Sequence, residues 1–309
     1  MSDLLVSVIV CTYNRAQLLK QCLDSLVVQS ADRNQFEVAI VDNNSTDNTF
    51  EISQQYIAKE PHFRYVTATK QGLSCARNVG WQTALGRYIA YIDDDAIAAP
   101  DWLEIALEFI AAHPEIKAFG GPYDAYTQTQ PPDWFPPEYG RLSFGNTTHP
   151  IRLVEEWIPG SNMVFSRDLF DRCGGFDERL GMSGTQTAYM EEIDFLLRLQ
   201  ASGVEIFYVH NLKVSHLIAD YKMHLKWLLR STYSEGRSAR KTFMKERCWY
   251  SHSAAILKTF FAIFVKFLVP RKLPLQRRIY YALQWFAWEL GAFREYFQER
   301  WPWCSRAVK

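Results

Sequence analysis

The chain has 309 residues, of which 48% are apolar and 15% aromatic, and these values exclude a disordered or fibrous protein. This length permits one large domain or two. The six cysteines are scattered without a Cys-x-x-Cys pair, which excludes a zinc site of that spacing and fits a reduced, cytosolic setting. The N-terminus has no basic segment followed by a long apolar run, so we expect no signal peptide.

Charge is distributed unevenly along the chain, although the formal net charge is zero. Residues 1–212 contain 15 Lys and Arg against 28 Asp and Glu, a balance of −13. Residues 213–278 contain 15 basic and 3 acidic residues, a balance of +12. Such an asymmetry is informative about partners. We therefore predict two regions with different tasks: an α/β domain over residues 1–220 and a helical, basic and aromatic region over residues 221–309.

Apolar runs and helical patterns alternate in the first 120 residues. Strands are predicted at residues 5–11, 36–41, 63–67, 88–92 and 117–119. Helices are predicted after residue 15, after a cap at Ser45 or Thr46, and at residues 74–85 and 101–112. Near-continuous apolar strands suit burial on both faces of a sheet. The alternation predicts an α/β fold with a mainly parallel sheet.

Polar clusters follow three of these strands, at Thr12–Arg15, Asp42–Asn44 and Asp93–Asp95. Because ligands of such sheets bind beyond the carboxyl ends of the strands, we expect the three clusters to meet at one edge. Consecutive carboxylates repel one another, and two of them can hold a divalent cation that in turn binds phosphate oxygens. The alternative for the aspartate run is a solvated acidic turn without a ligand.

The pattern changes between residues 123 and 160. The run from Pro131 to Pro137 contains four prolines and is incompatible with a helix or a central strand, so we predict an aromatic-rich loop. Regular structure is predicted again at residues 162–166, 167–173 and 204–209. A helix is predicted from Tyr189 or Met190 to about Ala201, with Gly203 as its end signal.

From about Tyr221 the chain is predicted to be helical. The segment Ala254–Val269 is apolar, interrupted mainly by Lys258 and Lys266, and it is shorter than the roughly 20 residues that a membrane span requires. Basic residues follow between 271 and 278, and an aromatic helix comes after them. Apolar faces with basic flanks favour attachment in the membrane interface. The alternatives are a helical subdomain packed on the catalytic domain, or a dimer interface.

Seven short stretches stand out within residues 5–216. They are Val6–Arg15, Val41–Asp47, Ala76–Gly80, Asp93–Asp95, Gly174–Glu178, Glu191–Asp194 and the outlying His216. In this order, the set resembles family 2 glycosyltransferases of the GT-A fold. The resemblance implies a Rossmann-like mixed, mainly parallel sheet flanked by helices, here with a helical C-terminal extension. It does not reach the C-terminal third of the chain.

The resemblance also implies a nucleotide-sugar donor, and a UDP-sugar is favoured. Asp42 is similar to the family's base-reading carboxylate, and a carboxylate can accept a hydrogen bond from the imide N–H of uracil. Arg77 resembles the family's contact to the diphosphate or to the ribose side of the donor, and a guanidinium is well suited to phosphate oxygens. The alternative for Arg77 is a surface salt bridge. The other residues that the resemblance places around the donor are Thr12, Tyr13, Asn14, Arg15, Asn44, Asn78, Asp93 and Asp94.

A divalent metal, Mn²⁺ or Mg²⁺, is the cofactor that the resemblance implies. It would offset the negative charge that develops on the departing diphosphate. Asp95 is similar to the family's metal ligand, and His216 to the late histidine that completes the metal shell. Asp93 could take either role, that of the donor contact Asp94 or that of the metal ligand Asp95, because a run of three aspartates leaves the register of the motif open. The alternative for His216 is a structural histidine.

The general base is expected among the carboxylates at the start of the helix that begins near residue 190. The family has Glu-Asp where this chain has Glu191-Glu192, so Glu192 takes the base position by register. Glu191 or Asp194 could serve instead, and the alternative is that all three simply favour the helix dipole. One base opposite one leaving group implies a single displacement with inversion at the anomeric carbon.

We therefore expect an inverting, metal-dependent glycosyltransferase of hexosyltransferase type that acts in polysaccharide or glycolipid biosynthesis. Its acceptor would be a hydroxyl of a glycan or a lipid-linked sugar, and no nucleic-acid partner is expected. The expected location is cytoplasmic, at the inner face of the plasma membrane. Two alternatives stay open: an inactive membrane-surface adaptor with the same fold, suggested by Glu192, and an aspartate-nucleophile phosphatase, suggested by Asp93-x-Asp95.

Overall fold

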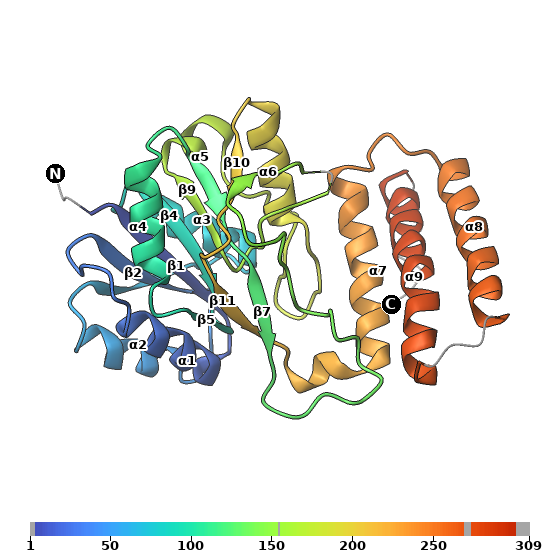
Figure 1. Ribbon diagram of the computed structural model, residues 1–309, viewed down its shortest axis with the longest axis horizontal. Coiled ribbons are helices and arrows are strands. Elements are labelled where there is room, and N and C mark those ends of the chain that lie inside the picture. The colour runs from blue at the N-terminus through green and yellow to red at the C-terminus, as the bar shows by residue number, and fades with distance from the viewer. Residues whose placement is uncertain (1–3, 154, 269–272, 301–309) are drawn as a thin grey trace. The chain divides into compact units, whose positions relative to one another are not determined.

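The computed structural model describes residues 4–153, 155–268 and 273–300. The chain forms two compact units, each assembled from separated segments (Figure 1). Unit 1 comprises Met1–Tyr126, Gly140–Arg179 and Glu191–Leu217. Unit 2 comprises Thr127–Tyr139, Leu180–Met190 and Ile218–Lys309.

Unit 1 is built around a mixed sheet of eight strands in the order β3-β2-β1-β4-β9-β6-β10-β8. Their bounds are β1 (Val6–Thr12), β2 (Phe36–Asp42), β3 (Phe63–Thr67), β4 (Tyr88–Asp93), β6 (Ala118–Gly120), β8 (His149–Pro150), β9 (Met163–Ser166) and β10 (Ile206–Tyr208). The first four strands of this order are parallel, whereas β9 runs antiparallel to both of its neighbours. The predicted α/β class with a mixed, mainly parallel sheet is confirmed.

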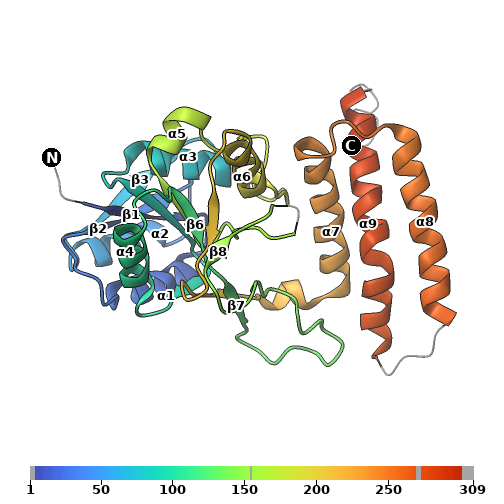
Figure 2. The same cartoon turned by 45° about the horizontal axis from the view of Figure 1, so that its top comes forward.

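Helices cover both faces of this sheet, which explains why its central strands are apolar on both sides (Figure 2). α1 (Ala16–Val27) and α4 (Trp102–Ala112) pack against one face, with Leu23 and Trp102 fully buried. α3 (Leu73–Thr83), α5 (Asp168–Cys173) and α6 (Glu191–Ala201) pack against the other, around Phe170 and Phe195. α2 (Thr49–Ile57) follows β2.

Element boundaries differ from the predictions in small, explicable ways. β1 and β2 extend through Thr12 and Asp42, because these two residues pair with each other in the parallel ladder. The residue before α2 is Asn48 rather than Ser45 or Thr46. The region 123–160 was expected to be irregular, but it contributes β7 (Tyr123–Tyr126) and β8, whose short length hides the alternating pattern of a strand.

A second, three-stranded sheet lies in unit 1 in the order β5-β11-β7. β5 (Ala96–Ala98) follows the aspartate run directly, and β11 (Val214–Leu217) pairs with it in antiparallel register, so that His216 lies opposite Ala96. The Leu217 N–H also donates to the Asp95 carbonyl at 2.9 Å. This sheet therefore brings a histidine from late in the chain to the end of β4.

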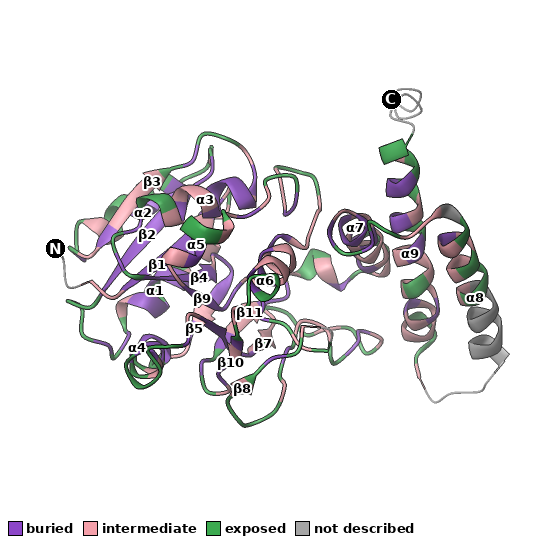
Figure 3. Cartoon of the chain, turned by 90° about the horizontal axis from the view of Figure 1, so that it is seen from above, coloured by how far each residue is buried: buried purple, intermediate pink, exposed green. Residues whose placement is uncertain are grey.

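Unit 2 contains the short 3₁₀ helix η1 (Asp220–Met223) and three long helices, α7 (Leu225–Thr242), α8 (Trp249–Leu268) and α9 (Leu275–Arg300). α9 lies between α7 and α8, and the faces of α7 and α9 that meet are largely buried (Figure 3). A Cβ on Gly236 would stand 1.9 Å from the Trp288 carbonyl oxygen, and one on Gly291 would stand 2.0 Å from that of Tyr233. Glycine at both positions is what allows these backbones to approach so closely.

The helices predicted after residue 221 are thus present. None of the described helices combines the length and the apolar character that a membrane span needs. Val269 to Lys272, the end of the predicted amphipathic segment and the start of its basic flank, lie outside the described residues. The proline-rich loop packs within unit 2, where the Arg277 guanidinium donates to the carbonyls of Trp134 at 2.9 Å and Phe135 at 2.8 Å.

Candidate active site

Three potential metal ligands converge where β4 ends. The ligand atoms of Asp93, Asp95 and His216 all lie within 4.8 Å of one another. His216 Nε2 is 3.2 Å from an oxygen of Asp95 and 3.6 Å from one of Asp93. Ligands of a six-coordinate ion at ~2.1 Å stand roughly 3 to 4 Å apart, so these three side chains fit a divalent cation such as Mg²⁺ or Mn²⁺.

The same carboxylates carry an excess of negative charge that Arg15 partly offsets. The Arg15 guanidinium lies 3.1 Å from Asp94 and 3.2 Å from Asp95, whose side chains are almost fully buried. Burial raises the pKa of Asp94 to about 6, Arg15 opposes this rise, and the adjacent Asp95 adds to it. For Asp93, burial is outweighed by the hydrogen bond with His216 and by the charge of Arg77, which bring its pKa below the usual value.

Arg77 of α3 connects the aspartate run to α6. Its buried guanidinium lies 2.7 Å from Glu191 and 3.2 Å from Asp93, and it donates to the Gly160 carbonyl at 3.2 Å. A Cβ on Gly160 would stand 2.7 Å from the same guanidinium, so any larger residue there would have to displace it. Arg77 is therefore an internal bridge between two acidic groups rather than a surface ion pair.

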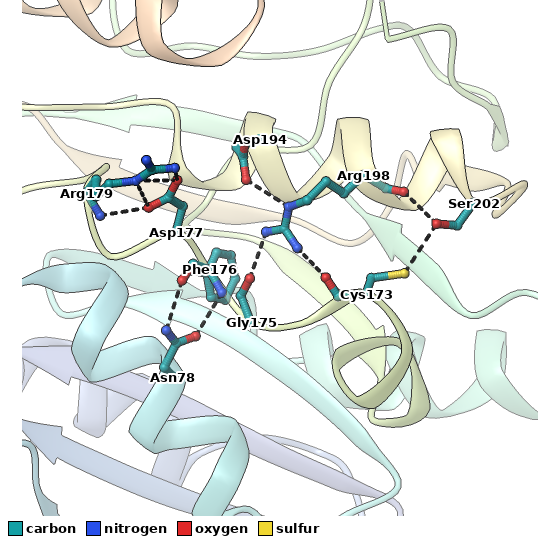
Figure 4. Close-up of polar contacts among 9 residues, drawn as sticks. All are labelled: Asn78, Cys173, Gly175, Phe176, Asp177, Arg179, Asp194, Arg198 and Ser202. Carbon is teal, nitrogen blue, oxygen red and sulfur yellow. Dashed lines mark hydrogen bonds and ion pairs between the residues drawn. The ribbon is translucent and has the colours of Figure 1, made fainter. Parts of the chain in front are cut away.

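The three predicted base candidates share the first turn of α6 but differ in their partners. Glu191 is buried against Arg77, and Asp194 is 2.9 Å from Arg198, which also donates to the carbonyls of Cys173 and Gly175 (Figure 4). Burial, followed by the neighbouring Glu191, raises the pKa of Glu192 to about 8, although Arg77 opposes this. A carboxyl with a pKa in this range is typical of a group that exchanges protons.

Asp42 and its neighbours form a second polar group, at the ends of β2 and β3. The buried Asp42 carboxylate accepts from the Ser45 N–H at 2.9 Å and from the Tyr65 hydroxyl at 2.6 Å. The exposed Asn44 has a left-handed φ of 65° and donates to the Thr69 carbonyl at 2.8 Å. These bonds fix the loops that follow the two strands.

The residues after β1 join this second group. Asn14, with a left-handed φ of 52°, accepts from the Thr46 N–H at 2.7 Å, and its own N–H donates to Ser45 Oγ at 2.9 Å. Thr12 ends β1 as a buried residue, and Tyr13 is half-buried beside it. The first two predicted clusters thus lie side by side, as parallel pairing of β1 and β2 requires.

Asn78 faces a different part of unit 1. Its amide donates to the Phe176 carbonyl at 2.9 Å and accepts from the Phe176 N–H at 2.8 Å (Figure 4). The NH₂ group and the oxygen of the Asn78 amide thereby both hold the Gly-Gly-Phe-Asp-Glu stretch. Ion pairs join seven of the predicted site residues into one network: Arg15, Arg77, Asp93, Asp94, Asp95, Glu191 and His216.

Two residues that support this site were given no individual role from the sequence, although one of them, Asn43, lies in the predicted Asp42–Asn44 cluster. Asn43 is buried and donates to the carbonyls of Ala68 and Lys70, while its oxygen accepts from the Gly72 N–H at 2.7 Å. Tyr65 holds Asp42, and burial, followed by this hydrogen bond, raises its pKa to about 12. Tyr65 lies two residues before the end of β3, a position that could have indicated its proximity to Asp42.

Comparisons with known proteins agree with this geometry. Residues 7–174 match the family described as glycosyl transferase family 2. Among curated proteins, the chain is similar to the glucosyl-dolichyl phosphate glucuronosyltransferase of Haloferax volcanii, with 27% identity over 76% of each chain.

Solved structures with the same fold include two proteins in complex with nucleotide sugars. One is the Pyrobaculum calidifontis mannosyltransferase PcManGT in complex with GDP-Man and Mn²⁺, with a TM-score of 0.55, 19% identity, and coverage of 98% of this chain and 76% of that one. The other is S. aureus TarS in complex with UDP-GlcNAc, with a TM-score of 0.58, 18% identity, and coverage of 96% and 92%. The predicted GT-A fold is confirmed, and the chain belongs to glycosyl transferase family 2 and is a glycosyltransferase.

Proposed function

We propose that the protein transfers a sugar from a nucleoside-diphosphate donor to a hydroxyl group, with inversion and with the help of a divalent cation. One observation carries this proposal. The candidate cation site of Asp93, Asp95 and His216 is connected through Arg77 to Glu191, the residue next to Glu192. A group for the leaving diphosphate and a group for the incoming hydroxyl are thereby held in one charged network.

Asp93, Asp95 and His216 would hold the cation, either Mn²⁺ or Mg²⁺. Its chemistry would be to offset the charge of the diphosphate as the bond to the sugar breaks. Arg15 adds positive charge beside Asp94 and Asp95, where a guanidinium can also meet phosphate oxygens. The carboxylates of Asp93 and Asp95 would thus be ligands of the cation and would not react themselves.

Glu192 is our candidate for the general base. Asp194 pairs with Arg198 and Glu191 pairs with Arg77, whereas none of the described ion pairs involves Glu192, whose pKa is raised. Deprotonated Glu192 would accept the proton of the acceptor hydroxyl while the oxygen of that hydroxyl bonds to the anomeric carbon of the donor sugar. The electron pair of the breaking C–O bond leaves with the nucleoside diphosphate, so one displacement inverts the configuration.

For the donor we favour a UDP-sugar, with Asp42, Thr12 and Asn14 at the nucleoside. Support comes from the position of the buried Asp42 carboxylate at the carboxyl end of β2, where ligands of such sheets bind. Tyr13, Asn44 and Asn78 stay predictions as donor contacts.

The acceptor that we propose is a lipid-linked or glycan hydroxyl, reached at a membrane surface. The Haloferax relative is described as acting on a glucosyl-dolichyl phosphate. In unit 2, the exposed large side chains of α8 and α9 include Tyr250, Leu257 and Trp285. Aromatic and apolar side chains of this kind are favoured in the interface of a bilayer.

The central test is release of nucleoside diphosphate from a panel of UDP-, GDP- and other nucleotide sugars with Mn²⁺ or Mg²⁺, with and without lipid-linked acceptors. Glu192→Gln should lower transfer about 10²- to 10⁴-fold. Glu205→Gln, which alters an exposed carboxylate of unit 1 outside the motifs, is the matched control and should retain activity. A protein that binds donors but never releases nucleoside diphosphate would instead be an inactive adaptor.

Membrane contact has its own test, namely sedimentation with vesicles of anionic or neutral phospholipid at low and high salt. We expect binding to anionic vesicles that weakens as salt is added, and less binding after Trp285→Ser. Equal recovery in the supernatant with and without vesicles would contradict the membrane part of the proposal. The transferase part would be unaffected.

A further inference from the structure

We propose that Tyr65 is a positioning residue for base recognition, which fixes the Asp42 carboxylate so that it favours uracil over cytosine. This inference rests on the proposed place of Asp42 at the nucleoside of the donor, and the residues that carry it all belong to unit 1. The Tyr65 hydroxyl donates to Asp42 Oδ2 at 2.6 Å, and the Ser45 N–H donates to Asp42 Oδ1 at 2.9 Å. Each oxygen of the carboxylate is therefore held by a different donor.

The parallel pairing of β2 with β3 brings these two side chains together. Ile40 of β2 is the register partner of Tyr65, and Asp42 lies two residues beyond Ile40. Because residues two apart on a strand point to the same face of a sheet, Tyr65 and Asp42 are diagonal neighbours on one face. Phe50 of α2 also packs edge-on against the Tyr65 ring, with 5.3 Å between the ring centroids. The hydroxyl thus reaches Asp42 from a ring that is itself held in place.

The hydrogen bond orients the carboxylate without using up its capacity to bind a ligand. Burial, followed by the bond to Asp42, raises the pKa of Tyr65 to about 12, so the hydroxyl keeps its proton at neutral pH and donates it. A carboxylate has lone pairs for about four hydrogen bonds. The bonds from Tyr65 and Ser45 use one position on each oxygen, which leaves positions for an N–H group of a base.

Pyrimidine bases differ in what they present to such a carboxylate. N3 of uracil carries a hydrogen and donates it, whereas N3 of cytosine is an acceptor that a carboxylate repels. UDP and CDP share the ribose and the diphosphate, so a comparison of the two isolates the base. A hydrogen bond to a charged group is worth roughly 10- to 150-fold in affinity. Because hydrogen bonds weaken steeply when their alignment is lost, a carboxylate that turns freely would lose much of this preference.

A purely structural role for Tyr65 would stabilise the sheet and leave the choice of base unchanged, so the experiment measures that choice. Calorimetric titration of the full chain with UDP and with CDP, each with Mn²⁺, gives two dissociation constants. In Tyr65→Phe, which removes only the hydroxyl, the Kd of UDP should rise about tenfold and that of CDP should change by less than about twofold. With a UDP-sugar as donor, KM should rise by a similar factor while kcat stays within about twofold, because the bond to the base is the same in the ground and transition states.

Tyr56→Phe is the matched control, because the Tyr56 hydroxyl also donates to an aspartate, Asp24, and joins α2 to α1 away from the site. Any loss of thermal stability in this variant should leave the ratio of the two dissociation constants at its wild-type value. Phe50→Ala keeps the Tyr65 hydroxyl but removes the contact to its ring. It should shift the ratio in the same direction as Tyr65→Phe, by a smaller factor.

An unchanged ratio of the UDP and CDP constants in Tyr65→Phe would overturn the inference, whether or not thermal stability falls, and so would tighter binding of UDP. Asp42→Asn keeps this inference distinguishable from the proposed function. It should abolish the preference for UDP, because an amide can also donate to N3 of cytosine. If Asp42→Asn abolishes the preference and Tyr65→Phe does not, only the role of Tyr65 fails. If the preference survives Asp42→Asn, or if the wild type has none, the place of Asp42 at the base fails as well.

Discussion

The two units treat buried charge in opposite ways. In unit 2 the carboxylates of α9 each meet a basic side chain: Glu295 lies 2.7 Å from Arg237 and 3.1 Å from Lys241, and Glu289 lies 3.3 Å from Arg247. In unit 1, by contrast, five carboxyl groups, those of the three aspartates and of Glu191 and Glu192, lie near only two guanidinium groups and His216 among the described residues.

This difference separates a scaffold from a binding site. The charges between α7 and α9 already neutralise one another, so a charged ligand would gain little by binding there. These ion pairs also neutralise part of the excess positive charge of residues 213–278. The excess of negative charge in this part of unit 1 makes the site costly without a ligand, and a cation with a diphosphate would relieve that cost. The predictions below test this contrast, beginning with the largest expected effect.

Asp95→Asn should have the largest effect on activity. Replacing one oxygen of the candidate cation site should lower nucleoside diphosphate release by about 10³-fold, or roughly 4 kcal/mol in the barrier. The control is Asp124→Asn, an exposed aspartate that is paired with Arg141 outside the site. Transfer that survives Asp95→Asn, or that is insensitive to EDTA, would contradict the assignment of the cation site.

Arg77→Gln should have the largest effect on stability. It leaves Glu191 and Asp93 without their shared buried partner, and breaking a buried pair in this way typically costs about 3–5 kcal/mol. Urea unfolding followed by circular dichroism measures the change. Arg141→Gln, which breaks an exposed pair with Asp124, should cost less than about 1 kcal/mol. Equal losses in the two variants would refute the bridging role of Arg77.

Glu192 should make activity and stability respond to pH in opposite directions. Its pKa of about 8 means that the deprotonated fraction, and with it kcat, falls about tenfold per pH unit below pH 8. Because this pKa is raised on folding, protonated Glu192 favours the folded state. That contribution is fully present below the usual pKa of a glutamate and is lost as the pH rises through 8.

Thermal unfolding and initial rates, both measured between pH 5 and pH 9, test these opposite trends. The Glu192→Gln variant should lose the pH-dependent stability change that Glu192 causes. A rate that stays flat between pH 6 and pH 8 would show that Glu192 is not the group that titrates.

Lys241→Ala should have the smallest effect. It removes one of two basic partners of Glu295 and leaves Arg237 in place, so the free energy of unfolding should fall by less than about 1 kcal/mol. The neighbouring exposed Lys245→Ala serves as the comparison. A loss of several kcal/mol would mean that the charges of unit 2 are as interdependent as those of unit 1.

The sequence predicted those parts of the site that depend on local pattern. The strands before Thr12, Asp42 and Asp93 are continuous apolar runs, and parallel pairing brings their ends to one edge. The position of His216 depends instead on the antiparallel pairing of β11 with β5, two short strands separated by more than a hundred residues. Only the resemblance to a family pointed to that histidine.

Other features had no local signal at all. The pairing of Arg77 with Glu191 joins residues 114 positions apart, and nothing in either neighbourhood distinguishes it from a surface pair. The same holds for Leu180–Met190, which belongs to unit 2 although it lies between two segments of unit 1. A prediction with a single domain boundary at residue 220 cannot describe two units that are each built from several separated segments.

The glycine contacts between α7 and α9 restrict how the helical unit can move. Sliding one helix along the other by a single turn would bring larger side chains, such as Thr232 or Arg240, to the place that Gly236 now occupies against the Trp288 carbonyl. The two helices are therefore locked in longitudinal register. A movement of α7 within unit 2 that keeps these contacts must therefore carry α9 with it.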